Sequence, residues 1–392
     1  MRVLTVGNLY PPHHLGGYEL MWRSAVGRLR EHGHEVRVLT TDWREPSADA
    51  SIPEDEDVHR ELRWYWHDHA FPRMGPVAVA RLERHNARTL DRHLEEFRPD
   101  AVSWWAMGGM SLSLITRAQL PAQCVVVDDW LLYGPKVDRR TRFTRRPSTE
   151  AIEGSARWLF ASQTLLDRAR ENGWPMPDAE IVHPGIDQAL FSAPPERRPW
   201  SWRLLYCGRI DERKGIDLAI DALAHLPAEA RLQVVGSGDE RHLEELRHHA
   251  GRAGVRVSFE RHPRAELPRI YAEADATLFP VRWDEPFGLV PLESMAMGTP
   301  VVASGRGGSA EYLSDGENCL LADPDGGAEA LAAAVRRLAT EPALSELISR
   351  QGAATAARYG DERFDLAVER SLTEAMPSGS EGAGTAPPPA GS

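Results

Sequence analysis

The chain has 392 residues, which is long enough for two or three domains that each bury their own core. Apolar residues make up 42% of the sequence and charged residues 27%, the proportions of a globular protein. The 46 basic and 58 acidic residues give a net charge of −12, which argues against nucleic acid as the general partner.

The cysteines and the apolar runs indicate the compartment. Cys124, Cys207 and Cys319 are isolated and odd in number, which speaks against a disulfide framework or a zinc site and suits a reducing environment. No apolar run reaches the roughly 20 residues of a membrane span. We therefore expect a cytoplasmic location. Five arginines lie in 139–146, where a surface loop is the favoured interpretation and a weak peripheral membrane contact the alternative.

The first 40 residues have the pattern of a βαβ unit. A strand is predicted over 2–7, a helix over 18–32 and a second strand over 35–40. Between the first strand and the helix lies a loop that ends in Gly16 and Gly17. Because glycine has no Cβ, these positions let the backbone come close to a ligand, although a plain turn would also explain the pair.

The next part of the chain continues the first domain. The segment 41–75 is expected to be irregular, followed by a helix over 76–97 and a strand over 100–105. A strand over 124–127 ends at Asp128, and the last strands are predicted over 158–162 and 181–184. Tryptophans are concentrated in this region. Core packing explains most of them, but the concentration also favours a pocket for a ring-shaped acceptor, with Trp64, Trp66, Trp104 and Trp105 as its wall.

A second domain is expected after the proline-rich segment 193–200. It opens with a strand over 203–208 and a helix from Ile216, and Arg209 and Lys214 flank the turn between them. Two cations beside the free N–H groups of a helix start can bind a diphosphate. The chain has only two lysines, Lys136 and Lys214, which makes Lys214 more notable in this position.

The stretch 274–311 is predicted to form strand, loop, helix, strand and glycine loop. The first strand covers 276–280, the helix begins near Leu289, and the second strand covers 301–304. Glu285 lies just beyond the first strand and Glu293 lies in the helix. Ligands bind at such strand ends in open α/β sheets. Further helices are expected from Ser309, over 328–359 and over 363–375, before a low-complexity tail.

Two motifs resemble those of family 4 retaining glycosyltransferases that use nucleotide sugars. The nonapeptide that runs from Glu285 to Glu293 (EPFGLVPLE) matches their E-x7-E signature, and residues 208–215 match G-R-x4-K-G. The resemblance implies the GT-B fold, an α/β architecture of two facing Rossmann-like, doubly wound domains with a crevice between them. It places an acceptor domain at 1–195, a donor domain at 196–360, a helix returning to the first domain at 361–376 and a disordered tail at 377–392.

The resemblance also implies an activity and a set of residues. A hexose would pass from a UDP- or GDP-sugar to a small-molecule or glycan acceptor, as in carbohydrate or natural-product glycosylation, with retention of the anomeric configuration and without a metal or other cofactor. Glu285 is then the catalytic residue of the donor side, and Glu293 accepts hydrogen bonds from the ribose. The remaining donor-binding positions are Gly16, Gly17, Arg209, Lys214, Phe287, Gly288, Leu289 and Val290.

Asp128 is the main departure from the family pattern, because many members have a histidine there. We expect an ionised Asp128 that cannot donate a proton at neutral pH, and that orients an acceptor hydroxyl or pairs with a cationic acceptor. An aspartate that only caps the next segment is the structural alternative. Two other functions also stay open: a non-catalytic nucleotide-sugar-binding protein, and an epimerase or phosphorylase on the same fold.

Overall fold

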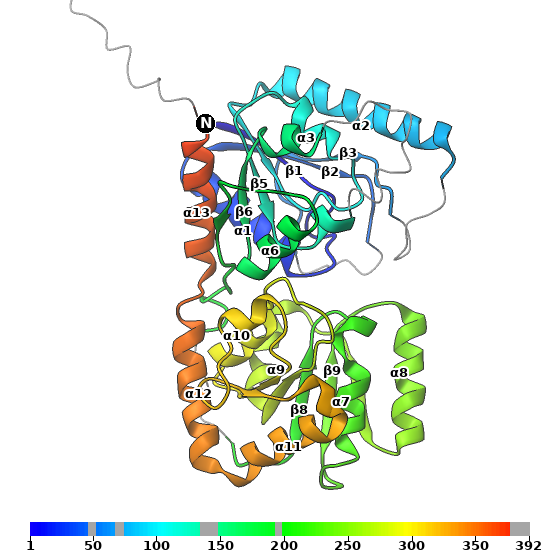
Figure 1. Cartoon of the computed structure of the whole chain (residues 1–392), viewed down its shortest axis with the longest axis vertical. Coiled ribbons are helices and arrows are strands. Elements are labelled where there is room, and N and C mark those ends of the chain that lie inside the picture. Colours follow the sequence, from blue (N-terminus) through cyan, green and yellow to red (C-terminus); the bar gives the residue numbers. More distant parts are fainter. Residues whose placement is uncertain (46–51, 67–73, 134–147, 193–197, 377–392) are drawn as a thin grey trace, which may run out of the picture.

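The computed structural model describes residues 1–45, 52–66, 74–133, 148–192 and 198–376. They form two α/β domains, one above the other in Figure 1, each built on a parallel sheet. The predicted architecture of two facing α/β domains is confirmed. The arginine-rich segment 139–146, Lys136, most of the segment 193–200 and the tail 377–392 lie outside the described residues.

The first domain has a seven-stranded sheet in the order β3-β2-β1-β4-β5-β6-β7. Its strands are β1 (Arg2–Val6), β2 (Glu35–Thr41), β3 (Val58–Leu62), β4 (Ala101–Trp104), β5 (Ala122–Val126), β6 (Arg157–Phe160) and β7 (Glu180–Ile181). Its helices are α1 (Gly17–Glu31), α2 (Pro76–Phe97), α3 (Ser113–Arg117), α5 (Thr149–Glu153) and α6 (Gln163–Glu171). Strands β4 and β5 are buried throughout, as short apolar runs in a sheet covered on both faces should be.

The second domain has a six-stranded parallel sheet in the order β10-β9-β8-β11-β12-β13. Its strands are β8 (Arg203–Cys207), β9 (Arg231–Val235), β10 (Arg256–Glu260), β11 (Ala276–Phe279), β12 (Val301–Ala303) and β13 (Leu320–Leu321). Its helices are α7 (Ile216–Leu223), α8 (Glu240–Ala253), α9 (Leu267–Glu273), α10 (Leu289–Ala296), α11 (Gly327–Thr340) and α12 (Pro342–Ala356). The turn that contains Lys214 is a 3₁₀ segment, Glu212–Lys214, between β8 and α7.

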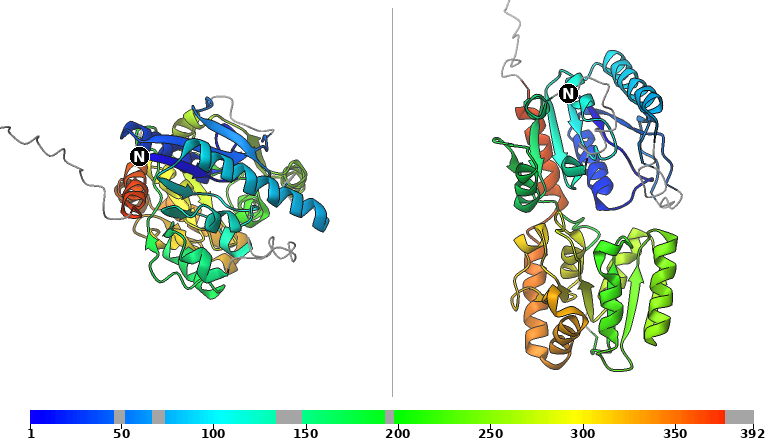
Figure 2. Two further views of the ribbon diagram at one scale, coloured as in Figure 1. Left: turned by 90° about the horizontal axis from the view of Figure 1, so that it is seen from above. Right: turned by 45° about the vertical axis from the view of Figure 1, so that its right-hand side comes forward.

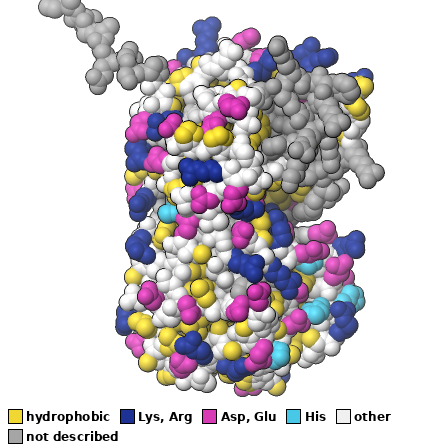
Figure 3. Space-filling view, viewed as in Figure 1, with side chains coloured by type: hydrophobic (Ala, Val, Ile, Leu, Met, Phe, Trp, Pro, Cys, Tyr) yellow, Lys and Arg dark blue, Asp and Glu magenta, His cyan; other side chains and the backbone are white. Residues whose placement is uncertain are grey.

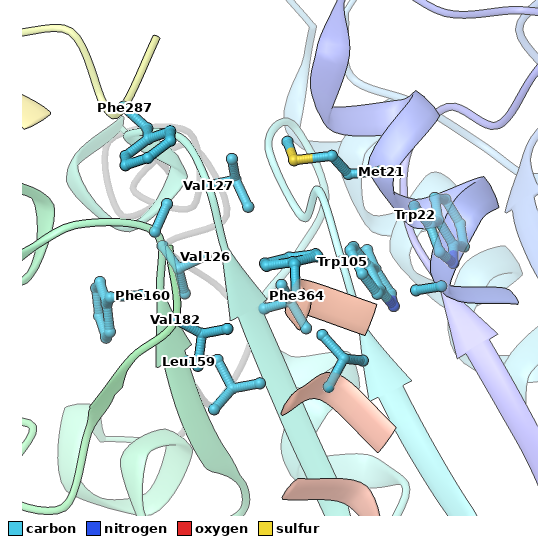
Figure 4. Close-up of a cluster of buried hydrophobic side chains, with 14 of the residues drawn as sticks. Met21, Trp22, Trp105, Val126, Val127, Leu159, Phe160, Val182, Phe287 and Phe364 are labelled. Carbon is cyan, nitrogen blue, oxygen red and sulfur yellow. The ribbon is translucent and has the colours of Figure 1, made fainter. Parts of the chain in front are cut away.

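The chain returns to the first domain at its C-terminal end. After α12, the helix α13 (Asp361–Glu374) runs beside the first domain and packs on α1 (Figures 1 and 2). Phe364 of α13 meets Trp105 at a ring distance of 6.3 Å in the core of that domain (Figure 4). The chain therefore passes between the domains twice, and the two passages meet where Ile186 pairs with Gly360.

The structure corrects three of the sequence predictions. Strand β3 lies within 41–75, which was expected to be irregular; its residues Val58–Leu62 (VHREL) form a half-buried edge strand without a clear apolar alternation. The helix expected from Ser309 is a single 3₁₀ turn, Gly308–Glu311. Trp104 and Trp105 are 0% and 1% exposed, so they belong to the core and cannot form the wall of a pocket.

Candidate functional site

A cleft lies between the domains, where the carboxyl ends of the two sheets face each other. Its lining includes residues of the loops that follow the strands: Asn8 after β1, Asp128 after β5, Arg209 after β8 and Glu285 after β11. Figure 3 shows Lys and Arg side chains beside Asp and Glu side chains at the level where the domains meet. Ligand sites of open α/β sheets are found at such strand ends.

Lys214 and Glu285 form an ion pair within the cleft. The Lys214 Nζ atom lies 2.6 Å from Oε2 of Glu285, and both side chains are nearly buried, with 13% and 11% of their surface exposed. The indole Nε1–H of Trp283 donates a hydrogen bond to the same carboxylate oxygen at 2.9 Å. The second carboxylate oxygen of Glu285 has no hydrogen bond among the described residues.

Arg209 and Arg213 bring two more cations to this side of the cleft. Both approach Asp211: the Arg213 side chain donates two hydrogen bonds to it, at 2.9 and 2.8 Å, and Nε of Arg209 lies 3.8 Å away. Although burial alone would raise the pKa of Asp211, these hydrogen bonds and charges hold it well below its usual range. Asp211 therefore stays ionised and keeps Arg213 in place, while the Arg209 side chain remains 37% exposed.

The second glutamate of the signature is held from two directions. Glu293 lies in α10 and is 4% exposed; Arg264 donates to its Oε1 at 3.0 Å and the Tyr271 hydroxyl donates to its Oε2 at 2.9 Å. The Arg264 guanidinium also lies 5.4 Å from the centre of the Phe191 ring. Both carboxylate oxygens thus have a protein donor before any ligand arrives, and each has a further lone pair to offer.

The loop before α10 is shaped by one glycine. Gly288 caps the helix with a φ of +89°, and a Cβ there would lie 3.2 Å from the Phe279 ring and 3.4 Å from Cγ of Glu285. Leu289 and Val290 line the cleft with their half-buried side chains. Phe287 is 1% exposed and stacks on His183 at 5.5 Å, so its side chain joins the domains (Figure 4) and only its backbone can meet a ligand.

The glycine pair of the first domain lies opposite, at the start of α1. Gly16 caps the helix, and its N–H donates to Oε2 of Glu19 at 3.0 Å. A Cβ at Gly17 would lie 3.1 Å from Cδ1 of Leu289, so this position is where the two domains come close. Glu19 is 7% exposed, and burial raises its pKa; it lies near Arg209 across the cleft.

Asp128 follows β5 and faces the cleft, half-buried. Its Oδ1 accepts the backbone N–H of Trp130 at 3.1 Å and its Oδ2 accepts the Tyr133 hydroxyl at 3.4 Å, so it also caps the next segment. Burial raises the pKa of Asp128 to about 7, with the neighbouring Asp129 adding to the shift. The expectation that Asp128 cannot donate a proton at neutral pH is therefore wrong, because with a pKa of about 7 this carboxyl is partly protonated there.

Two of the four tryptophans expected to form a wall do line the cleft. Trp64 and Trp66 lie next to each other, with ring centres 4.6 Å apart, and Trp64 donates its Nε1–H to the Gly108 carbonyl at 2.7 Å. Both rings belong to the first domain, beyond the end of β3. They give that side of the cleft an apolar face next to its carboxylates.

Polar contacts join the two domains beside the cleft. Ser162 Oγ donates to the Pro286 carbonyl at 2.6 Å, and Arg168 donates to the Asp284 carbonyl at 3.2 Å. Glu311 of the second domain accepts the Thr164 backbone N–H at 3.0 Å and lies 2.9 Å from Nε2 of His183. Although burial alone would raise the pKa of Glu311, these partners lower it, so the carboxylate stays charged at neutral pH.

Three residues that hold the signature glutamates in place were not predicted from the sequence. Trp283, Arg264 and Tyr271 hold the two glutamates of the signature, but they come from positions that the motif does not include. For Trp283, its position two residues before Glu285 could have indicated a contact with that carboxylate. A 3₁₀ turn and a short helix bring the other two to Glu293, and their sequence has no motif of its own.

One group of metal-type side chains lies away from the cleft, at the edge of the first sheet. Ligand atoms of His59, Glu61 and His93 all lie within 4.8 Å of one another. Glu61 is already paired with Arg92, and Nε2 of His59 lies 2.7 Å from Asp57. Burial lowers the pKa of His93, which is neutral at pH 7. The charges of this group are balanced by its protein neighbours.

Comparisons with protein families cover most of both domains. Residues 15–190 match the model described as Glycosyltransferase Family 4, and residues 201–341 match the model described as Glycosyl transferases group 1. No helix among the described residues is both long and apolar enough to cross a membrane.

Two of three curated relatives match along nearly the whole chain, and the third matches over less than half of it. A glycogen synthase of Mycobacterium tuberculosis is 27% identical over 386 residues, covering 89% of each chain. A D-inositol 3-phosphate glycosyltransferase of Paenarthrobacter aurescens is 26% identical and covers 92% of this chain and 93% of the relative. The corresponding protein of Xylanimonas cellulosilytica is 35% identical over 199 residues, covering 44% of this chain and 48% of the relative.

Solved structures show the same fold. HepE of Anabaena, in complex with UDP and glucose, superposes with a TM-score of 0.74 at 20% identity and covers 95% of this chain and 99% of its own. The sucrose-phosphate synthase of Thermosynechococcus elongatus gives a TM-score of 0.73 at 20% identity, covering 95% and 98%. With two matching family models, full-length relatives and this shared architecture, the chain belongs to glycosyltransferase family 4 and is a glycosyltransferase with the GT-B fold.

Proposed function

We propose that the chain transfers a hexose from a nucleotide diphosphate sugar to a small-molecule or glycan acceptor, with retention of the anomeric configuration. The observation that carries this proposal is the convergence of Arg209, Lys214 and Glu285 beside the start of α10. The relatives' names support a nucleotide-sugar donor, since HepE has been solved with UDP-glucose and with UDP.

The diphosphate would lie between the turn after β8 and the start of α10. Arg209 and Lys214 supply positive charge, and the first turn of α10 supplies N–H groups without partners in the helix. A cation about 4 Å from a phosphate contributes about 4 kcal/mol at an effective dielectric of about 20, before the cost of desolvation. As the bond between the sugar and the phosphate breaks, these groups stabilise the charge of the leaving diphosphate.

The nucleoside would extend from the diphosphate toward Glu293. Its carboxylate accepts hydrogen bonds from the ribose hydroxyls, each contributing about 1.5–3 kcal/mol for a charged acceptor. The base would reach the segment 261–263, which lines the same part of the cleft. Arg264 and Tyr271 then serve to hold Glu293 in one orientation.

The acceptor would bind on the first domain, against Trp64 and Trp66 and within reach of Asp128. Arg23 and Arg28, which line the cleft on this side, are each paired with carboxylates, whereas Glu19 and Asp128 have no cation in direct contact among the described residues. A neutral or cationic ring therefore suits this wall better than a phosphorylated one.

Retention would follow attack on the same face from which the diphosphate leaves. The acceptor oxygen forms its bond to the anomeric carbon as the bond from that carbon to the phosphate oxygen breaks, and the acceptor proton passes to the departing phosphate. Asp128 orients the attacking hydroxyl. Glu285 faces the sugar with the carboxylate oxygen to which no described residue donates.

A donor screen tests the proposal. Purified protein is incubated with UDP- and GDP-hexoses, and the release of UDP or GDP is measured with and without candidate acceptors. Bound nucleotide should also raise the melting temperature through mass action. Tight nucleotide binding without turnover would favour the non-catalytic alternative. Turnover of a free sugar phosphate, or isomerisation of the donor, would favour a phosphorylase or an epimerase.

A further inference from the structure

Trp283 contacts three charged groups on the donor side of the cleft. The centre of its ring lies 4.2 Å from Cζ of Arg213 and 5.3 Å from Nζ of Lys214. Its Nε1–H donates to Oε2 of Glu285 at 2.9 Å. One side chain thus combines two functions: its ring faces the cations, and its N–H faces the carboxylate.

Lys214 and Trp283 donate to the same oxygen of Glu285. Glu285 is 9% exposed, so water has little access to its carboxylate and cannot readily replace a hydrogen-bond donor that is lost. The Lys214 Nζ lies 2.6 Å from Glu285 and has three N–H donors, so when it turns toward the diphosphate of the donor its hydrogen bond to the carboxylate weakens. Trp283 is then the remaining donor to that oxygen.

We propose that Trp283 is a positioning residue whose indole N–H holds the Glu285 carboxylate, so that Lys214 is free to bind the diphosphate of the sugar donor. This inference rests on the proposed function of the cleft. The ring has a separate effect, because it packs on Arg213, and Asp211 holds that guanidinium independently through two hydrogen bonds. The N–H and the ring can therefore be tested apart.

Trp283→Phe removes the N–H and keeps an aromatic ring for Arg213. Without the indole donor, Glu285 retains Lys214, and the dissociation constant of UDP or GDP, whichever the parent binds more tightly, should rise about fivefold or more by isothermal titration calorimetry. The matched control is Trp200→Phe. Trp200 is a half-buried tryptophan of the same domain that does not line the cleft, and its replacement should leave the constant unchanged.

A double-mutant cycle shows whether Trp283 acts through Glu285. In a Glu285→Ala background Lys214 has no carboxylate to hold it, and Trp283→Phe should change nucleotide affinity less than about twofold. A Lys214→Ala background gives the same test and keeps the buried carboxylate. Unchanged affinity in the single Trp283→Phe variant, or an equal loss in all three backgrounds, would overturn the inference. A parent protein that binds neither nucleotide would instead contradict the proposed function itself.

Discussion

The Nζ atom of Lys214 lies 2.6 Å from Oε2 of Glu285, although the two residues are 71 positions apart in the sequence. The pairing of β8 with β11 brings them together, because Lys214 is in the turn after the first strand and Glu285 in the loop after the second. Parallel neighbours end at the same edge of a sheet, so a cation and a carboxylate that follow such strands meet at the cleft.

Lys214→Ala should weaken the binding of nucleoside diphosphates about tenfold or more, which corresponds to about 1.4 kcal/mol, because one of the two cations at the diphosphate is lost. Titration calorimetry with UDP and GDP measures this. The matched control is Arg282→Ala, which removes a cation that pairs with Asp217 and does not line the cleft. Equal affinities in the Lys214→Ala variant and the parent would show that Lys214 does not bind the diphosphate.

Asp128→Asn should slow transfer by about 10²-fold or more, the usual scale for a positioned acid–base or orienting group. Nucleotide affinity should stay within about twofold, because the donor binds to the other domain. In the parent, the rate should rise between pH 6 and pH 8 with a midpoint near 7, since burial raises the pKa of Asp128 to about 7 and the ionised form orients the hydroxyl. Transfer by the Asn variant at the parent's rate would leave Asp128 with its capping role alone.

Asp365→Asn should stabilise the protein at alkaline pH. The carboxyl lies between α13 and α1, is 3% exposed, and accepts a hydrogen bond from Ser24 at 2.7 Å; burial raises its pKa to about 7. The folded protein therefore keeps a proton that the unfolded chain loses near pH 4, and stability declines as the pH rises from about 4 to 7.

Because asparagine has no charge to bury, the variant should gain up to about 4 kcal/mol over the parent at pH 8. This advantage should shrink as the pH falls and should vanish near pH 4. Urea unfolding at several pH values measures it. A difference between the two proteins that stays constant with pH would mean that Asp365 does not titrate in this range.

Gly185→Ala should strongly destabilise the crossing between the domains. A Cβ at Gly185 would lie 2.1 Å from the carbonyl carbon of Gly360, where backbone atoms of both passages meet. Neither segment can move without breaking the pairing of Ile186 with Gly360. The substitution should therefore lower the free energy of unfolding by more than about 2 kcal/mol. Thermal unfolding checks this against Gly251→Ala in α8, where a Cβ meets nothing within 4 Å and helix propensity favours alanine. Equal melting temperatures for the two variants would refute the close approach.

Much of the fold could be predicted because the central strands of a covered parallel sheet are short apolar runs that end at a glycine or charged loop. The helix at Ile216 and the strands over 203–208 and 231–236 were recognisable for this reason. Strand β3 was not, since it is a half-buried edge strand with polar side chains. Trp104 and Trp105 suggested a binding wall, but side chains on both faces of a central strand are buried in this fold.

The candidate site could be predicted only where a family motif follows a predicted strand. This is the case for Lys214, which follows β8, and for Glu285 and Glu293, which follow β11. The groups that orient these side chains come from other elements: Arg264 and Tyr271 reach Glu293 from a 3₁₀ turn and α9, which precede β11. Sequence spacing does not reveal such contacts. The titration of Asp128 is likewise not visible in the sequence, because its pKa depends on burial in the folded chain and on charges from other elements, among them Glu19 and Arg209.

The most direct test of the account is the proton NMR spectrum of the reaction with the nucleotide sugar that the protein turns over, recorded as transfer proceeds. We predict that an α-configured donor gives an α-linked product, identified by the coupling constant of its anomeric proton. At a donor concentration below its dissociation constant, Lys214→Ala should slow the growth of this signal about tenfold or more while the folded structure persists. A β-linked product would contradict the retaining mechanism. Failure to consume any UDP- or GDP-hexose, with no binding of either nucleotide, would contradict the proposed donor.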